Sequence, residues 1–207
     1  MPARLRPTAP IAADAILVGD PGRALMLAQE LLAEPKMSNH ARGLWGYTGV
    51  TEAGDQLTIQ ATGMGGPSAS VVLADLAELG VRQAIRVGTC ASLGDLELGD
   101  LLVVNEARDG ARPDGRLTDD LRAALPDVHF GLVLSLDSLY RPERDLPSAL
   151  AEAADMQTAA LFTTAAEVEI AAAAVLVVTE RSDSGQLPDE ELMKVAKVAG
   201  RAAADVL

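Results

Sequence analysis

Three glycine-containing segments hold the residues with the clearest chemical potential, and each follows a run of apolar residues. They are Ile16–Arg23, Thr62–Ser70 and Ala84–Ser92. In the first, Asp20 can cap a helix that has Pro21 in its first turn. The free N–H groups of a helix N-terminus bind anions, and Arg23 adds a full positive charge there. The alternative is an ordinary strand–turn–helix with a surface arginine.

The second segment repeats this pattern with more glycine. Gly63, Gly65 and Gly66 allow a ligand to approach the backbone closely, and Pro67 suits the start of a helix. No Gly-Lys-Ser/Thr follows, and the glycine spacing differs from the dinucleotide-binding fingerprint. The segment therefore indicates an anion-binding turn that is neither a Walker-type phosphate loop nor a dinucleotide-binding turn. A simple tight turn is the alternative.

In the third segment, Arg86 interrupts an apolar strand. A buried guanidinium without a partner is strongly unfavourable, so Arg86 must meet a carboxylate or a bound anion. Thr89 follows near the end of the strand, where ligands bind in α/β sheets. Together the three segments favour a pocket for inorganic phosphate or a similar oxyanion. An internal Arg–Asp ion pair is the alternative for Arg86.

Composition limits the classes of protein to consider. The chain has 207 residues, of which 49% are hydrophobic and 2% aromatic, so we expect one domain over residues 1–207 with an Ala, Val and Leu core. The formal net charge of −13 disfavours nucleic acid and anionic membranes as partners. Cys90 is the only cysteine, which fits a reducing compartment. With no signal-peptide pattern and no membrane-length apolar run, the expected location is the cytoplasm.

Apolar runs of strand length alternate with helical patterns, which predicts a three-layer α/β/α fold. Gly54 and Asp55 indicate a hairpin turn, so the central sheet should be mixed. The expected strands are Ala15–Val18, Trp45–Thr51, Gln56–Thr62, Ala84–Val87, Leu101–Asn105, Val128–Ser135 and Val175–Thr179. The expected helices are Gly22–Ala33, Pro67–Leu79, Leu117–Leu125, Thr158–Ala172 and Pro188–Val206. The polar segment Asp109–Gly115 is expected to be a surface loop and is a weak candidate for a lid.

A fourth segment, Asn39–Gly49, completes a set of four ordered motifs with the three above. In order and spacing, this set resembles the nucleoside phosphorylase family, which includes hexameric purine nucleoside phosphorylases and uridine phosphorylases. The resemblance is clearest from Ile16 to Ser92 and continues more weakly to the C-terminus. It implies the fold of that family and a homo-oligomer, assembled as a homohexamer of dimers that share active sites.

The resemblance also implies a phosphate site. Its residues are Gly19, Arg23, Arg86 and Thr89, together with Arg42 from a neighbouring subunit. Arginine suits this task because its planar guanidinium binds phosphate oxygens in pairs. Inorganic phosphate would be a co-substrate, and no metal or other cofactor is expected.

The sugar and base contacts come from the same resemblance. Met64, Met156 and Gln157 would contact the ribose, and Cys90, Ala91 and Leu139 the base. The family has a glutamate where this chain has Gln157. A carboxylate can accept hydrogen bonds from two ribose hydroxyls, whereas an amide carries no charge and accepts fewer.

The segment Val177–Asp183 resembles the strand end that carries the acidic residue of the purine enzymes. Asp183 would contact the base and protonate purine N7 as the glycosidic bond breaks. Arg181 is the second predicted catalytic residue, at a position that resembles an arginine of the uridine enzymes. The arginine that follows the aspartate in the family has no counterpart in the residues after Gly185. A helix cap or solvated turn is the alternative role for Asp183.

The activity implied is phosphorolysis of a nucleoside, with purines favoured, to a free base and ribose 1-phosphate. The partners are then the small molecules nucleoside and phosphate. Gln157 and the short segment between Asp145 and Ala154 leave three alternatives open. These are a family member that binds without turnover, an N-ribosyl hydrolase and a uridine phosphorylase.

Overall fold

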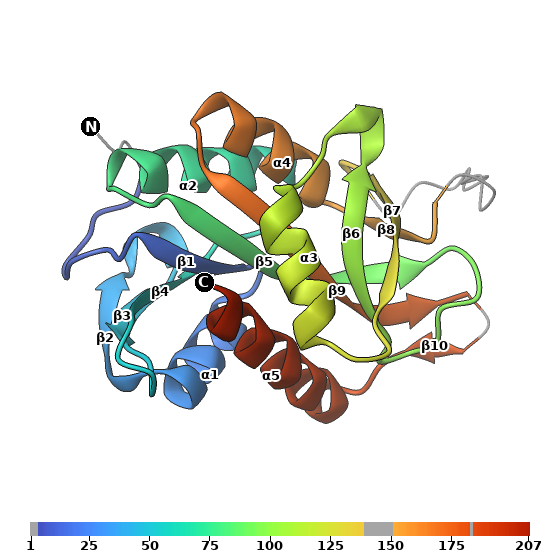
Figure 1. The fold of residues 1–207 in the computed structure, drawn as a ribbon, viewed down its shortest axis with the longest axis horizontal. Helices are drawn as coiled ribbons and strands as arrows, with labels where there is room; N and C mark the ends of the chain where they lie inside the picture. The colour runs from blue at the N-terminus through green and yellow to red at the C-terminus, as the bar shows by residue number, and fades with distance from the viewer. Residues whose placement is uncertain (1–3, 139–150, 183) are drawn as a thin grey trace.

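The structure is a computed structural model that describes residues 4–138, 151–182 and 184–207. Figure 1 shows a strongly twisted central sheet with helices packed on both sides. The strands are β1 (Asp14–Val18), β2 (Ala33–Asn39), β3 (Gly46–Val50), β4 (Gln56–Ala61), β5 (Gln83–Ser92), β6 (Leu101–Ala107), β7 (His129–Ser135), β8 (Ala153–Asp155), β9 (Ala171–Arg181) and β10 (Gly185–Gln186). The helices are α1 (Pro21–Leu31), α2 (Gly66–Glu78), α3 (Gly115–Ala124), α4 (Thr158–Glu167) and α5 (Asp189–Val206).

The sheet has the strand order β10-β9-β6-β7-β8-β5-β1-β4-β3-β2, with a further pairing between β9 and β5. That pairing closes β5, β9, β6, β7 and β8 into a ring of strands, from which β1 to β4 extend. β1 runs parallel to β4 and β5, and β5 runs parallel to β9, whereas β3 is antiparallel to β4. The sheet is therefore mixed, as predicted from the hairpin turn, where Gly54 has φ +98°.

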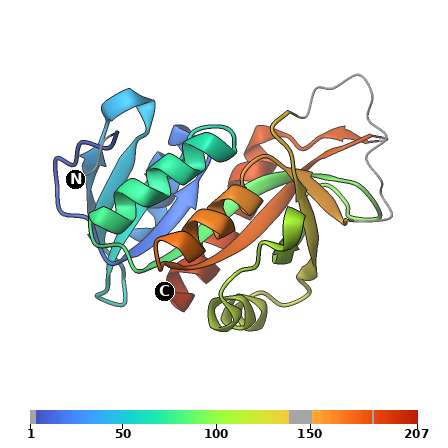
Figure 2. The same ribbon diagram turned by 90° about the horizontal axis from the view of Figure 1, so that it is seen from above.

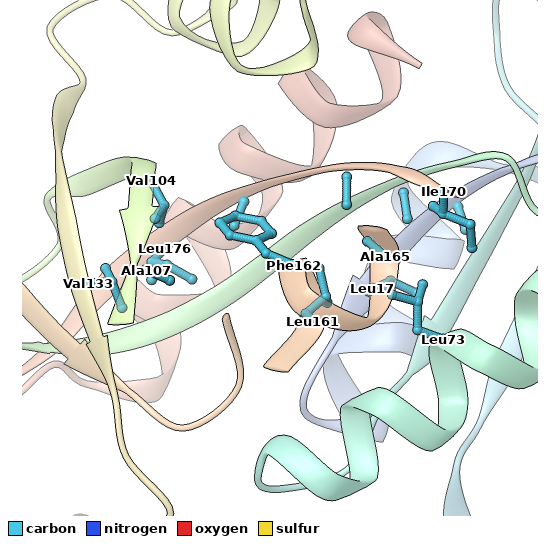
Figure 3. Close-up of a cluster of buried hydrophobic side chains, with 14 of the residues drawn as sticks. Leu17, Leu73, Val104, Ala107, Val133, Leu161, Phe162, Ala165, Ile170 and Leu176 are labelled. Atoms are coloured by element: carbon cyan, nitrogen blue, oxygen red, sulfur yellow. The ribbon is translucent and has the colours of Figure 1, made fainter. Parts of the chain in front are cut away.

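The helices form two layers, one on each face of the sheet. α2 and α4 pack against each other on one face, as Figure 2 shows, and α5 contacts both α1 and α3 on the other. Each layer covers its own core. Figure 3 shows part of the core under α2 and α4, where Leu73 and Phe162 meet strand residues such as Leu17 and Leu176. The expected three-layer α/β/α architecture is thus confirmed.

The largest difference from the expected elements lies after α4. The helix ends at Glu167, and Ala171 and Ala172, which were expected to form its end, instead begin β9. Ala172, Ala173 and Ala174 are buried in the sheet, opposite Ala84, Ile85 and Arg86 of β5. Alanine has a high intrinsic helix propensity, so burial on both faces of the sheet decides the outcome here.

The sequence reading also missed three short or irregular strands. β2 carries two register shifts against β3, and β8 and β10 are only three and two residues long. Such segments carry little periodicity. The segment expected to be a loop begins with a 3-10 turn over Arg108–Gly110, with Asp109 at φ +63°. No helix of the described residues is long and apolar enough to cross a membrane.

Candidate phosphate and nucleoside pocket

One cavity of about 520 Å³ lies where the parallel strands β1, β4, β5 and β9 end, and the turn after β8 also contributes. Ligands commonly bind at this edge of an α/β sheet. The predicted site residues that line it are Gly19, Arg23, Met64, Arg86, Thr89, Cys90, Ala91, Met156 and Gln157. The fold therefore brings together residues that are as much as 138 positions apart (19 to 157).

Arg23 reaches the cavity from the first turn of α1. Asp20 caps this helix by accepting a 2.8 Å hydrogen bond from the Arg23 backbone N–H. The Arg23 side chain is buried, with 8% of the residue exposed, and its Nη1 has no hydrogen-bond partner among the described residues. Burial and the nearby Arg86 lower the pKa of Arg23. Both effects disfavour a charge at this position, the charge of Asp20 offsets them in part, and a bound anion would offset them further.

Arg86 lies in β5 and is engaged on three sides. Its Nη2 donates to Asp155 Oδ2 at 3.1 Å, its Nη1 to Gln157 Oε1 at 2.6 Å, and its Nε to Thr158 Oγ1 at 3.3 Å. The internal Arg–Asp pair considered from the sequence is therefore present. Arg86 nevertheless lines the cavity, and two of its five N–H groups are left without such a bond. The guanidinium is thus held in place by protein groups and still has donors for a ligand.

Asp155 is the carboxylate that orients Arg86. It is 2% exposed and also accepts bonds from the Thr158 backbone N–H at 3.0 Å and the Thr158 hydroxyl at 2.6 Å. Ser135 donates to its other oxygen. Asp155 therefore pairs with Arg86, whereas the nearby negative charge that favours a charged Arg23 is that of the exposed Asp20.

The amide of Gln157 links Arg86 to the glycine turn after β4. Its Oε1 accepts from Arg86 and, at 3.1 Å, from the Thr62 hydroxyl. Its Nε2 donates to the carbonyl oxygens of Gly63 at 2.8 Å and Gly65 at 3.3 Å. An amide offers two acceptor sites and two donors, and three of these four are fully used here. The fourth shares the single Thr62 hydroxyl proton with the Val18 carbonyl, which lies 3.0 Å from that hydroxyl. Gln157 is therefore mainly engaged by protein groups.

The glycine turn itself requires glycine. Gly63 and Gly65 have φ of +73° and +81°, in the left-handed region that side chains disfavour. Between them, Met64 is 86% exposed at the cavity. Gly88 has a different role, because a Cβ there would lie 2.6 Å from Arg86 Cζ. Because Gly88 has no side chain, the Arg86 guanidinium can occupy the space beside it.

Cys90, Ala91 and Thr179 form a less polar wall of the cavity. Burial raises the pKa of the Cys90 thiol, and the charge of Asp155 raises it further. Both effects favour the neutral thiol over a nucleophilic thiolate. The Thr179 hydroxyl donates to the Cys90 carbonyl at 3.3 Å and fixes β9 against β5 at this point.

Two predicted residues lie away from this cavity. Arg42 is exposed, with φ +60°, beside a separate surface cavity that is also lined by Arg4, Arg6 and His40. Arg181 pairs with Glu97 at 2.5 Å and donates to the Leu96 carbonyl at 3.1 Å. The structure therefore does not bring Arg181 to the other site residues. Leu139 and Asp183 lie outside the described residues.

Sequence reasoning did not single out Thr179 and Glu180, which both line the cavity. The signal available was their position at the end of a buried apolar run, at the edge of the sheet where the other site residues were expected. Across the described ranges, no group of three or more His, Cys, Asp or Glu side chains gathers in a way that could hold a metal ion.

Fold and cavity together define an α/β protein with an arginine-lined cavity at the ends of its parallel strands. The chain matches the family model described as the phosphorylase superfamily over residues 14–207. It is 33% identical over 201 residues to DeoD-type purine nucleoside phosphorylases of Bacillus cereus and Bacillus thuringiensis, covering 85% of each chain. This chain therefore belongs to the phosphorylase superfamily, and the resemblance seen in the sequence is confirmed.

Solved structures show the same fold at lower sequence identity. A uridine phosphorylase from Vibrio fischeri superposes with a TM-score of 0.86 at 24% identity, covering 95% of this chain and 91% of that one. A purine nucleoside phosphorylase from Toxoplasma gondii, in complex with immucillin-H, gives a TM-score of 0.84 at 20% identity, with 94% and 91% covered. The nucleoside-phosphorylase-like fold is thus confirmed.

Proposed function

We propose that this protein catalyses the phosphorolysis of a nucleoside, with a purine nucleoside favoured, to a free base and ribose 1-phosphate. The observation that carries the proposal is Arg23, a buried guanidinium whose Nη1 lacks a partner among the described residues. Arg86 lies close enough to lower its pKa. Two guanidinium groups and a helix N-terminus that converge on one cavity suit a phosphate dianion.

In the proposed reaction, a phosphate oxygen attacks the anomeric carbon of the ribose as the bond from that carbon to the base nitrogen breaks. The electron pair of the broken bond leaves with the base, and the sugar passes through a cationic transition state. Arg23, Arg86 and Thr89 would hold the phosphate against that carbon. Binding of this kind lowers the barrier mainly by positioning the nucleophile and by electrostatic stabilisation.

The departing base leaves more readily when it is protonated. We assign this proton transfer to Asp183, on the resemblance of its segment to the purine enzymes, with proton delivery at purine N7. Arg181 is left out of the proposal because its guanidinium is engaged by Glu97 and the Leu96 carbonyl.

Arg42 enters the proposal through a second subunit. It lies outside the cavity of its own chain, in an exposed turn beside a surface cavity whose other lining residues include two arginines. We propose a dimer in which each chain supplies Arg42 to the phosphate of its partner, within a homohexamer. A closed symmetric assembly lets one surface patch serve both subunits in this way.

The test is base release from inosine, guanosine, adenosine and uridine, each with and without inorganic phosphate. Phosphorolysis requires release that depends on phosphate and yields ribose 1-phosphate in equal amount. Equal release without phosphate would identify an N-ribosyl hydrolase. Binding by calorimetry with no release from any nucleoside would identify a protein that binds without turnover.

A further inference from the structure

Glu180 is a carboxylate that lines the cavity and is not used by the proposed reaction. The other two cavity carboxylates are engaged, since Asp20 caps α1 and Asp155 bonds Arg86 and Thr158. Within the part of the chain that the structure describes, the Glu180 side chain has no hydrogen bond or ion pair. It is half-buried, so a ligand in the cavity would complete its bonding.

The place of Glu180 in the sheet sets it apart from the phosphate end. It lies near the end of β9, opposite Ala91 of β5, while the phosphate residues Gly19 and Arg23 follow β1. β5 separates β1 from β9, so the two strand ends are two strand spacings, about 10 Å, apart across the sheet. A pentose ring fits this interval, so a nucleoside with its sugar at the phosphate end would extend its base toward Glu180.

The surroundings of Glu180 suit a flat heterocycle. Cys90 and Ala91 are small and uncharged, and Thr179 donates its hydroxyl to the Cys90 carbonyl. Among the described residues of the cavity lining, the charged group at this wall is therefore Glu180 itself. A single acceptor group on a mostly apolar wall is an arrangement that fixes the orientation of a ligand.

An ionised carboxylate accepts hydrogen bonds and donates none. Guanine presents two adjacent donors, N1–H and its 2-amino group, and so can bond both carboxylate oxygens. Hypoxanthine presents N1–H alone. Adenine presents the lone pair of N1 next to its amino group, and that lone pair would repel the carboxylate.

We propose that Glu180 reads the base edge and makes the pocket select a purine with an N–H donor at N1, guanine above hypoxanthine and hypoxanthine above adenine. The inference rests on the proposed function, because that function identifies the ligand as a nucleoside. It adds a specificity-determining residue in β9.

The experiment measures binding of guanosine, inosine and adenosine by calorimetry without phosphate, so that no turnover is needed. The wild-type protein should bind guanosine at least about 10-fold more tightly than adenosine. Glu180→Gln should reduce this ratio to about threefold or less, because an amide can pair with either edge. Glu52→Gln, at an exposed position of the β3–β4 turn, is the matched control and should keep the wild-type ratio.

A wild-type protein that binds adenosine as tightly as guanosine would overturn the proposal, and so would a Glu180→Gln variant that keeps the wild-type ratio. Turnover assays with phosphate separate this result from the proposed function. If guanosine undergoes phosphorolysis but the guanosine-to-adenosine binding ratio does not depend on Glu180, only the proposed role of Glu180 is contradicted. If guanosine binding depends on Glu180 but no base is released in phosphate, only the proposed phosphorolysis is contradicted. If no nucleoside binds, both proposals are contradicted.

Discussion

The Nη1 of Arg86 donates a 2.6 Å hydrogen bond to the Oε1 of Gln157, and both residues are almost fully buried. Through the Nε2 of Gln157, this bond extends to the carbonyl oxygens of Gly63 and Gly65. The cationic side of the cavity and the glycine turn that carries Met64 are thus parts of one hydrogen-bonded network. A change at Gln157 should therefore affect both.

Gln157→Glu tests that network. A carboxylate cannot donate to the Gly63 and Gly65 carbonyls, so two acceptors would face a negative charge in a buried position. We expect the free energy of unfolding to fall by about 1–3 kcal/mol, since Arg86 already has the carboxylate of Asp155 as a partner. Urea denaturation at pH 7 measures the change. A variant as stable as the wild type would mean that the amide donors contribute nothing.

Arg23 and Arg86 should behave differently when each is replaced by methionine. Removing Arg86 leaves Asp155 buried without its cation, which should lower stability by about 3–5 kcal/mol. Removing Arg23 leaves no such orphan, so Arg23→Met should be at least as stable as the wild type without ligand.

Phosphate should then stabilise the wild type but not Arg23→Met. At a phosphate concentration about 100 times Kd, the expected gain for the wild type is about 2.7 kcal/mol. Thermal unfolding in phosphate and in chloride at matched ionic strength measures it. An equal phosphate effect in both proteins would place the anion elsewhere.

Gly88→Ala should displace the Arg86 side chain while leaving its charge and its hydrogen-bond donors unchanged. The new Cβ would lie 2.6 Å from Arg86 Cζ and 2.7 Å from Leu176 Cδ2, closer than such atoms approach. We expect phosphate affinity to fall at least about 10-fold, equivalent to about 1.4 kcal/mol. Gly94→Ala is the control, since nothing lies within 4 Å of a Cβ at that position among the described residues. Equal phosphate affinity in the two variants would contradict this use of Gly88.

The sequence allowed the prediction of the phosphate end of the site because its residues follow short, regular patterns. Arg23 and Arg86 each stand in or beside a buried strand, where a charge is conspicuous. The partners of Arg86 could not be predicted in this way. Asp155, Gln157 and Thr158 lie about 70 positions away, at the end of a strand of three residues or just after it. Their role depends on the closure of β8 onto β5, which no local pattern encodes.

The same limit explains Glu180 and the alanine-rich start of β9. Ala171 to Ala174 have helix propensity, and their pairing with Gln83 to Arg86 of β5 makes this segment a strand. A bulge in that pairing occurs between Cys90 and Ala91, next to Glu180. Because bulges re-aim side chains, the face on which Glu180 lies could not be predicted from alternation along the strand.

The burial of the Cys90 thiol can be tested through the dependence of protein stability on pH. Its pKa is raised in the folded protein, so the native state keeps the proton at a pH where the unfolded chain, with a thiol pKa of 9.0, loses it. The contribution to stability is complete below pH 9.0 and decreases as the pH rises above it. The loss should be about 1.4 kcal/mol per pH unit.

Denaturant unfolding of the wild type and Cys90→Ala between pH 8 and pH 10 measures this difference. Cys90→Ala should lose less stability with rising pH, because its other titrating groups are unchanged. Parallel pH dependence in the two proteins would show that the thiol ionises equally in the folded and unfolded states.

Mixing two inactive variants can locate the action of Arg42. In a shared site, Arg23 comes from one chain and Arg42 from its partner. Arg23→Met and Arg42→Ala should each have little phosphorolytic activity as pure proteins. After joint unfolding and refolding, half of the dimers are mixed, and each mixed dimer contains one site with both arginines intact. Activity should therefore recover to about a quarter of the wild-type value. If Arg42 served its own chain, every site would lack one arginine, and the refolded mixture would be as inactive as its components.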